Sequence, residues 1–544
     1  MVPPSLEEVI LMLILQNLSY THPNRDLLFH DLNLTVNPQD KIALIGNNGV
    51  GKSTLLKILA GELSPSDGQL KVDVVPYYIP QIFGQFNHLT VAQALRVEEK
   101  LTAFHAILAG DASEENYARL NDDWTIESRC EEALSYWQLE DLDLNQQLDA
   151  LSGGQKTRVL LAGISIHQPE LVLMDEPSNH LDLAGRKLLY DFVQATTSTL
   201  LIVSHDRKLL SHLHLTCEMT PNGIAVYGGN YEFYSTQKQT ELDALNQDLQ
   251  NRETQLRKAK QKQRESMARQ QKLDARGKKK GIKSGMPKVM MNKLKNDAEN
   301  SSSKMKGIHR SKVDGISDEL RDLRAALPEI DKMKFGFEDS SLHQGKVLFK
   351  ATETNFSYGE KVLWARNLDI QVNSGERIAL KGPNGSGKTT FIRLLLGDLE
   401  PKTGKVERAA QHSVYIDQDY SLIDNSLTVY EQAQQFNTSA LLEHDIKIRL
   451  NRFLFSKEDW DKPCEALSGG ERMRLMLCCL TISQQSPDVI VLDEPTNNLD
   501  IQNIEILTRA INEYRGTLLV ISHDENFLEQ IGIERTIEMR KGSE

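Results

Sequence analysis

A set of short motifs occurs twice in this chain, and the repeat constrains the fold more than any other feature. The first half contains GNNGVGKST at 46–54, LSGGQ at 151–155, LVLMDEPSNHLD at 171–182 and SHD at 204–206. The second half contains GPNGSGKTT at 382–390, LSGGE at 467–471, VIVLDEPTNNLD at 489–500 and SHD at 522–524. A repeat in the same order predicts two domains of one architecture.

The spacing between the copies shows where they differ in length. The offset is 336 to 338 for Tyr20 with Tyr358, Lys52 with Lys388 and Gln81 with Gln418, and it is 316 to 318 from the LSGG motifs onward. The first copy therefore has about 21 extra residues between Gln81 and Leu151, where FHAILAGDASEENYARLNDDW predicts a helical insertion. An extended helix and a docking arm are both compatible with this segment.

Runs of two kinds alternate within each copy. β-Branched runs such as KIALIG alternate with helical runs such as KSTLLKILAGEL, which predicts an α/β fold with a mostly parallel sheet. The run 9–15 predicts a first strand and is far shorter than the roughly 20 residues of a membrane helix, so no membrane insertion is expected. Met1 and Met12 are both possible starts.

Charge and cysteine content limit the class of protein. The five cysteines show neither metal-ligand spacing nor a disulfide framework, which indicates a cytoplasmic protein. The net charge is -13, yet residues 257–312 contain 19 Lys or Arg and 4 Asp or Glu. The charge is therefore segregated, with a strongly basic segment in an acidic chain.

The basic segment lies in a predicted helical hairpin. From about Gln237 to Gly277 the sequence is polar and helical, with Leu242, Leu245, Leu249 and Leu256 at heptad-like spacing. A returning segment carries a matching apolar seam and ends at a proline; its residues are Val313, Ile316, Leu320, Leu323, Leu327 and Pro328. A solvated linker is the alternative, but it would not need two seams. The predicted domains are residues 1–235 with the insertion within 82–150, the hairpin 236–342, and residues 343–544.

Each copy contains a glycine-rich loop of the form G-x-x-x-x-G-K-[ST] between an apolar run and a helical run. Backbone N–H groups of such a loop converge on phosphate oxygens. Lys52 and Lys388 would contact the β and γ phosphates, and the hydroxyls of Ser53 and Thr389 would bind magnesium. The predicted nucleotide-binding residues of these loops are Gly46, Asn47, Asn48, Gly49, Val50, Gly51, Lys52, Ser53, Thr54, Gly382, Pro383, Asn384, Gly385, Ser386, Gly387, Lys388, Thr389 and Thr390.

An acidic pair ends an apolar run in each copy. Asp175 and Asp493 are expected at the carboxyl edge of a strand, where a parallel sheet binds ligands, and would hold magnesium. The adjoining Glu176 and Glu494 are placed to accept a proton from an attacking water or to orient it. A charged pair that merely ends a strand is the alternative, and the recurrence of DEP argues against it.

The LSGG loops precede helical runs and offer further N–H groups to a phosphate. Together with the phosphate loops, the acidic pairs and the SHD histidines, they make the chain resemble the ATP-binding-cassette superfamily over residues 12–235 and 345–541. The resemblance implies that ATP lies between two cassettes, where the phosphate loop of one faces the LSGG loop of the other.

The resemblance implies two composite sites. One combines Lys52, Ser53, Gln81, Asp175, Glu176 and His205 with Ser468 and Gly470; the other combines Lys388, Thr389, Gln418, Asp493, Glu494 and His523 with Ser152 and Gly154. Gly153 and Gly469 of the same loops are also expected to bind nucleotide. The implied catalytic residues are Glu176, Glu494, His205 and His523, and the implied magnesium ligands are Ser53, Gln81, Asp175, Thr389, Gln418 and Asp493. Tyr20 and Tyr358 are expected to stack on adenine, and burial of these rings in the core is the alternative.

Two cassettes joined by a basic helical hairpin are similar to the ABC-F family of ribosome-acting ATPases. The resemblance implies ATP and Mg²⁺ as cofactors and a hairpin that enters the tRNA exit site near the peptidyl-transferase centre. It implies ribosomal RNA and tRNA as partners, with ATP binding closing the cassettes of a monomer and hydrolysis releasing it. A translation factor, an antibiotic-resistance protein and, as a different class, the ATPase subunit of a separate membrane exporter remain open.

Overall fold

The computed structural model describes residues 12–81, 84–283, 296, 303, 307–308, 310–324, 333, 345–359, 361–409, 411–483 and 486–540. The chain divides into two compact units, one formed by Met1–Tyr234 with Met333–Glu544 and the other by Ser235–Lys332. We call residues 12–234 the first domain and 345–540 the second domain. Both belong to the same compact unit.

A six-stranded sheet forms the centre of the first domain. Its strand order is β5-β6-β7-β3-β8-β9, and all neighbours are parallel except β8 and β9. The strands are β3 (Lys41–Ile45), β5 (Tyr77–Ile79), β6 (Leu171–Asp175), β7 (Thr199–Val203), β8 (Leu215–Thr220) and β9 (Gly223–Tyr227). Every residue of β3, β6 and β7 is buried, because helices cover both faces of a parallel sheet.

The second domain repeats this sheet with five parallel strands in the order β16-β17-β18-β14-β19. These strands are β14 (Arg377–Lys381), β16 (Ser413–Ile416), β17 (Val489–Asp493), β18 (Thr517–Ile521) and β19 (Arg535–Glu538). The predicted α/β class and the duplicated architecture are confirmed.

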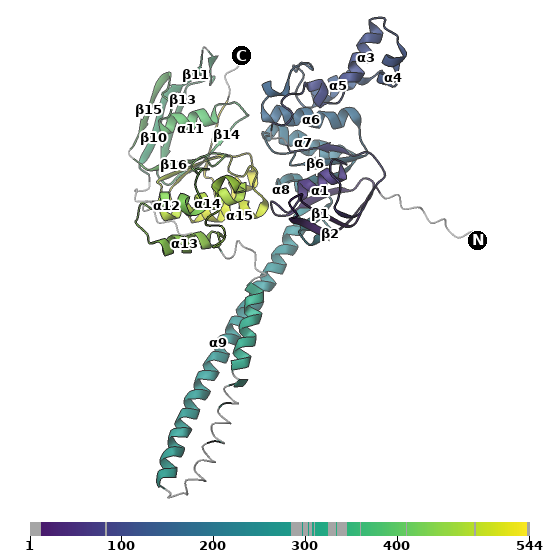
Figure 1. Ribbon diagram of the computed structural model, residues 1–544. Coiled ribbons are helices and arrows are strands. Elements are labelled where there is room, and N and C mark those ends of the chain that lie inside the picture. Colours follow the sequence, from purple (N-terminus) through teal and green to yellow (C-terminus); the bar gives the residue numbers. More distant parts are fainter. Residues whose placement is uncertain are drawn as a thin grey trace, which may run out of the picture. The chain divides into compact units, whose positions relative to one another are not determined.

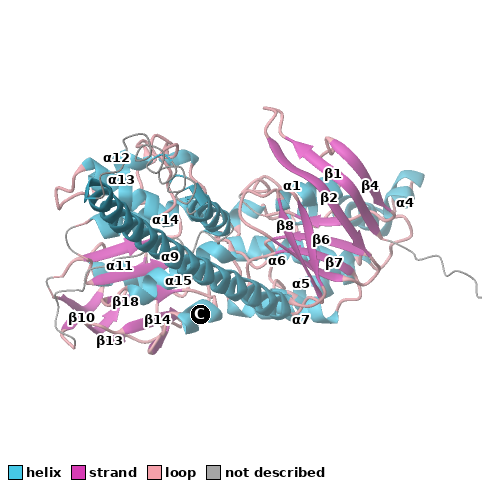
Figure 2. Cartoon of the chain, turned by 90° about the horizontal axis from the view of Figure 1, so that it is seen from below, coloured by secondary structure: helices cyan, strands magenta, loops and turns pink. Residues whose placement is uncertain are grey.

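Each domain also has a three-stranded antiparallel sheet, β2-β1-β4 in the first and β13-β10-β15 in the second. Figure 2 shows β1, β2 and β4 as a group of strands separate from β6, β7 and β8. The strands are β1 (Leu13–Thr21), β2 (Leu27–Val36), β4 (Asp67–Val72), β10 (Val347–Asn355), β13 (Leu368–Asn373) and β15 (Thr403–Arg408), with a hairpin of β11 (Ser357–Tyr358) and β12 (Lys361–Val362) in the second domain.

The helices of the two domains follow the same order, except that among the described residues the first domain has two additional helices, α3 and α4. Those of the first are α1 (Lys52–Leu59), α2 (Val91–Ala94), α3 (Glu98–Leu108), α4 (Glu114–Leu120), α5 (Ile126–Tyr136), α6 (Gly153–His167), α7 (Leu183–Ala195) and α8 (Arg207–Ser211). Those of the second are α11 (Lys388–Leu396), α12 (Val429–Gln435), α13 (Glu443–Arg452), α14 (Gly469–Ile482), α15 (Ile501–Glu513) and α16 (Glu525–Gln530). Short 3₁₀ turns at Leu148–Ala150 and Cys464–Ala466 precede α6 and α14.

The pair α3 and α4 has no counterpart among the described residues of the second domain. It accounts for the extra length of the first copy, and Figure 1 shows both helices beyond α5. The rings of Phe104, Tyr117 and Trp124 pack edge to face between them.

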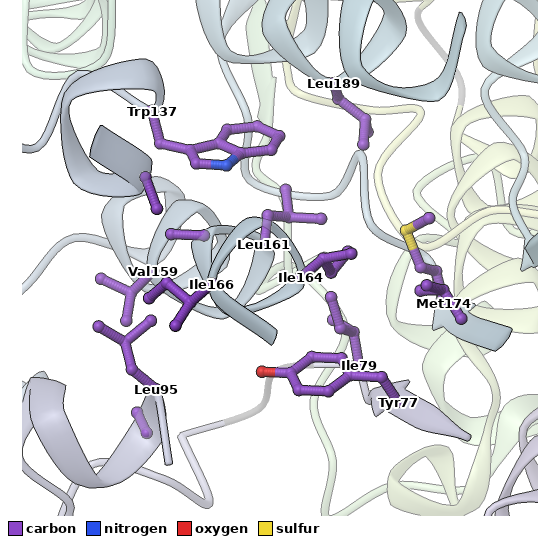
Figure 3. Close-up of a cluster of buried hydrophobic side chains, with 14 of the residues drawn as sticks. Tyr77, Ile79, Leu95, Trp137, Val159, Leu161, Ile164, Ile166, Met174 and Leu189 are labelled. Atoms are coloured by element: carbon purple, nitrogen blue, oxygen red, sulfur yellow. The ribbon is translucent and has the colours of Figure 1, made fainter. Parts of the chain in front are cut away.

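Helix α6 is the centre of the largest cluster of buried side chains. Val159, Leu161, Ile164 and Ile166 of this helix pack among residues of the sheet and of α5, and with the fully buried Trp137 that follows α5 (Figure 3). Because α6 begins at the LSGGQ motif, this core fixes the position of that motif.

The second compact unit is a helical hairpin. Helix α9 (Tyr231–Lys283) is 53 residues long, and residues 310–324 form a returning helix beside it (Figure 1). Leu320 is 3% exposed, while Leu242, Leu245, Leu249, Leu256, Val313, Ile316 and Leu323 are half-buried. The Gly- and Lys-rich segment 277–297 was expected to form the tip between the two helices, but α9 extends to Lys283 within it. Residues 284–295, Leu327 and Pro328 lie outside the described residues.

Helix α9 begins six residues before the predicted start because its first turn belongs to the core of the first domain. Tyr231 is buried, and the Tyr234 hydroxyl donates to Glu218 Oε1 at 3.1 Å. The helix continues through Gly277, since an isolated glycine costs a helix only about 1 kcal/mol. In the parts of the chain that the structure describes, no helix has the length and apolar character needed to cross a bilayer.

Candidate functional site

The two phosphate loops connect a central strand to a helix in each domain. The first lies between β3 and α1, and the second between β14 and α11. Gly51 and Gly387 cap these helices at φ 101° and 88°. A Cβ on Gly51 would lie 2.7 Å from Phe29, so both the backbone conformation and the space require glycine at this position.

The loop lysines are buried against their own loops. Lys52 Nζ donates to the carbonyls of Gly46 at 2.6 Å and Asn47 at 3.1 Å, and Lys388 Nζ repeats both contacts with Gly382 and Pro383. Burial lowers the pKa of both lysines, and nearby carboxylates oppose the shift. The two loops therefore present the same geometry.

A hydroxyl and a carboxylate meet at the end of each central strand. The Thr389 hydroxyl donates to Asp493 Oδ2 at 2.9 Å, and the Ser53 hydroxyl lies close enough to Asp175 to lower the pKa of that carboxyl group. Burial raises the pKa of Asp175, against the effects of Ser53 and Lys52. Its Oδ1 is buried and makes no hydrogen bond with a described residue.

Each following glutamate is held in a left-handed backbone conformation. Glu176 and Glu494 have φ of 51° and 50°, and their N–H groups donate to Val203 and Ile521 at 2.8 Å. Non-glycine residues seldom adopt this conformation because it is strained. It persists where the surrounding structure holds the backbone in place, as at many functional sites. It directs each carboxylate to a histidine, with His205 Nε2 3.2 Å from Glu176 Oε1 and His523 Nε2 3.3 Å from Glu494 Oε1.

Burial shifts both members of each pair toward their neutral forms. It raises the pKa of Glu176, against Lys52, and raises the pKa of Glu494 to about 7, against Arg186 and Lys388. It lowers the pKa of His205 well below its ordinary value and that of His523 to about 4. A carboxyl group that titrates near neutral pH is suited to accept a proton.

The LSGG motifs form capping boxes at the start of α6 and α14. The hydroxyl of Ser152 accepts the Gln155 N–H, and that of Ser468 accepts the Glu471 N–H, both at 3.3 Å. A Cβ on Gly154 would lie 2.7 Å from the carbonyl oxygen of His180. The motif thus packs tightly against the loop that follows the acidic pair of its own domain.

The loops 178–182 and 496–500, which follow the acidic pairs, contact the phosphate loop of the opposite domain. Asp500 Oδ2 accepts the Asn48 N–H at 2.8 Å, and Asp182 Oδ2 accepts the Asn384 N–H at 3.4 Å. The other oxygen of each aspartate caps its own helix, α15 or α7. Each aspartate therefore connects the N-terminus of a helix in its own domain to the phosphate loop of the other domain.

A cavity of about 660 Å³ lies at the first phosphate loop and is lined by both domains. It brings together predicted residues of the first domain, namely Asn48, Gly49, Gly51, Lys52, Ser53, Thr54, Gln81, Asp175, Glu176 and His205. From the second domain it contains the predicted Gly469 and also Gln418, which was predicted at the other site.

The two predicted adenine-stacking tyrosines differ in position. Tyr20 is half-buried against Phe29 and His22, and of these rings only His22 lines the cavity. Tyr358 is 60% exposed, and its hydroxyl lies 3.2 Å from Thr390 Oγ1 of the second phosphate loop.

Comparison with known proteins agrees with this geometry. The family model described as "ABC transporter" matches residues 29–179 and 365–497. The chain is similar to the putative ATP-binding protein YdiF of Bacillus subtilis, at 31% identity over 93% of this chain and 77% of that protein. It is also similar to ABC transporter F family member 5 of Arabidopsis thaliana, at 29% identity over 94% and 72%.

The chain belongs to the ABC-F family. It is therefore an ATP-binding protein with two cassettes, and it hydrolyses ATP. The ATP-binding protein Uup of Escherichia coli is another relative of this ABC-F protein, with 30% identity over 92% of this chain and 76% of Uup.

A solved structure shares the fold of this ABC-F ATPase. It is described as the complex of archaeal ribosomal stalk protein aP1 and archaeal ribosome recycling factor aABCE1. The TM-score is 0.59 at 21% identity, and the match covers 96% of this chain and 87% of the other. At this identity the match concerns architecture alone.

Several residues of the site were not among the predicted ones. They are Asp182, Asp500, His180 and Asn498 in the loops that cross between the domains, and His22, Asp419, Tyr420 and Arg472 in the cavity lining. The recurrence of SNHLD and TNNLD at one offset was a signal for the first group. For the second group we find no local signal in the sequence.

Proposed function

We propose that this ABC-F ATPase acts on the ribosome, where ATP binding closes its two domains and hydrolysis releases it. Charge is the observation that supports this proposal. Residues 257–312 contain 19 Lys or Arg and 4 Asp or Glu in a chain of net charge -13. A basic helical hairpin suits RNA because phosphate contacts supply affinity.

Within each site we assign one role to each predicted group. The phosphate loops and the LSGG serines and glycines bind ATP phosphates. Glu176 and Glu494 orient the attacking water and accept its proton, and His205 and His523 contact the γ-phosphate. The left-handed backbone of each glutamate supports this assignment, because it directs the carboxylate toward the histidine of the same site.

The side chains at the end of each central strand are suited to bind Mg²⁺. Ser53 with Asp175, and Thr389 with Asp493, place a hydroxyl and a carboxylate oxygen together, and oxygen donors are what this ion prefers. These four residues would hold the ion, with Gln81 and Gln418 as further predicted ligands. When bound, Mg²⁺ would neutralise part of the negative charge of the ATP phosphates.

Sedimentation with ribosomes tests the proposal. The double variant Glu176→Gln with Glu494→Gln should bind ATP without turning it over, so we expect it to sediment with ribosomes when ATP is present. The control is the same chain with Lys52→Ala and Lys388→Ala added, which should stay in the supernatant. Absence of the double Gln variant from the ribosome fraction in ATP would contradict a ribosomal target.

Deletion of residues 257–312 separates the ribosome from a membrane exporter as the target. A ribosome factor should keep basal ATP hydrolysis and lose binding to ribosomes, whereas an exporter subunit should not depend on the basic segment. As a finer test, neutralising Arg257, Lys258, Lys260 and Lys262 should weaken binding and reduce its salt dependence. Neutralising four exposed lysines of the second domain is the matched control.

Two roles on the ribosome are considered, that of a translation factor and that of an antibiotic-resistance protein. One growth experiment distinguishes them. A translation factor would adjust the peptidyl-transferase region, while a resistance protein would dislodge a bound drug. Overexpression in a susceptible host should raise tolerance to antibiotics of the large subunit only in the second version. Unchanged tolerance leaves the translation factor.

A further inference from the structure

Two ion pairs join α8 of the first domain to α15 and α16 of the second domain. Arg207 Nη2 lies 3.2 Å from Glu505 Oε1, and Lys208 Nζ lies 2.9 Å from Glu525 Oε2. The side chain of Arg207 is 16% exposed, and the other three are about half exposed. In both pairs the basic residue belongs to the first domain and the acidic residue to the second.

The internal repeat shows what these side chains would face in a pair of identical domains. At the offset of 318 residues, Arg207 corresponds to Glu525, and Glu505 corresponds to Lys187. Two first domains paired in the same way would set Arg207 against Lys187. Two second domains would set Glu525 against Glu505, so pairing of like domains brings like charges together.

The second ion pair gives the same result for two first domains. Lys208 contacts Glu525, whose equivalent in the first domain is Arg207. In a pair of first domains, Lys208 would therefore face a guanidinium.

We propose that these charges select the partner of each domain, so that a first domain closes on a second domain and rejects another first domain. Exposed ion pairs each add little affinity. Like charges placed in contact oppose association, and such repulsion is an effective source of specificity. The device therefore favours pairs of unlike domains over pairs of like domains.

The inference rests on the proposed closure by ATP, and a charge swap in the full chain tests it. In the Glu176→Gln, Glu494→Gln background, a donor and an acceptor dye placed one in each domain report closure during an ATP titration. Arg207→Glu and Glu505→Arg should each raise the ATP concentration for half-maximal closure several-fold. The two changes combined should return it to within about twofold of the parent chain.

The matched control is Arg119→Glu on α4, which reverses a half-exposed charge paired with Glu115 away from these ion pairs and should leave closure unchanged. If ATP closes the chain but single reversals have no effect, or if the swap fails to restore closure, the charge selection is wrong and the proposed function stands. If ATP changes the dye signal in no variant, both are wrong.

Discussion

The magnesium-binding aspartates proposed for the two sites differ in one tyrosine contact. Tyr78 and Tyr415 occupy equivalent positions on β5 and β16. The Tyr415 hydroxyl donates to Asp493 Oδ2 at 2.8 Å. The Tyr78 hydroxyl is buried and makes no hydrogen bond with a described residue, although Asp175 is close enough to help raise its pKa.

This difference predicts that replacing each tyrosine by phenylalanine changes the stability of the protein differently at the two sites. Tyr415→Phe removes a hydrogen bond to a charged group and should lower the free energy of unfolding by about 1.5–3 kcal/mol. Tyr78→Phe removes a buried hydroxyl without a protein partner and should be neutral or slightly stabilising. Urea unfolding followed by fluorescence measures both. Equal losses in the two variants would contradict the difference in bonding.

Stability should depend on pH through Glu494. Because burial raises its pKa from 4.5 to about 7, the folded chain holds the proton more tightly, and unfolding becomes easier as pH rises through that interval. Glu494→Gln removes this dependence. It should raise the stability at pH 8 by on the order of 3 kcal/mol and change little near pH 4.5, as melting temperatures across this range would show.

Glu471 provides a control, because its pKa is shifted in the opposite direction from that of Glu494. Burial raises the pKa of this residue, but bonds from Lys462 and Ser468 outweigh it and lower the pKa overall. Its contribution to stability is therefore present above the ordinary pKa of a glutamate and is lost as pH falls. Glu471→Gln should lower the melting temperature near pH 7 and have little effect at low pH. The same trend for both variants would refute the assigned shifts.

At the scale of elements, the hairpin depends on its apolar seam more than on its ion pairs. Leu320 is 3% exposed, whereas the pairs of Arg252 with Glu319 and Arg324 with Glu253 lie at the surface. Exposed ion pairs contribute up to about 1 kcal/mol, while truncation of a buried leucine costs 2–5 kcal/mol.

Leu320→Ala should therefore loosen the hairpin, and Arg324→Gln should not. The measurement is amide hydrogen exchange over 310–324 and the facing part of α9 in the full chain. We expect faster exchange in the leucine variant and nearly unchanged exchange in the arginine variant. A larger effect of Arg324→Gln would mean that charge, and not the seam, holds the two helices together.

The elements that the sequence predicted best have strong local signals. The strand, glycine loop and helix around Lys52 follow from an apolar run, the glycine spacing of the loop and a helical run, and the heptad spacing of the leucines predicts the partner helix. The ends of α9 were harder to predict. Its start depends on the burial of Tyr231 in the first domain, and its passage through Gly277 depends on the rest of a long helix.

At the scale of the whole molecule, the decisive contacts have no local signal. The bond from Asn48 to Asp500 joins residues 452 positions apart, and the same aspartate also caps α15. In the sequence, helix capping is enough to explain an aspartate at position 500. The sequence therefore gives no sign that Asp500 also contacts Asn48. The family resemblance predicted the pairing of the domains, but not the residues that connect them.

Small-angle X-ray scattering of the Glu176→Gln, Glu494→Gln chain, with and without ATP, is the most direct test of the central claim. Closure of two domains around nucleotide predicts a smaller radius of gyration in ATP, and addition of Lys52→Ala and Lys388→Ala should abolish the change. Identical scattering curves with and without ATP would contradict the account.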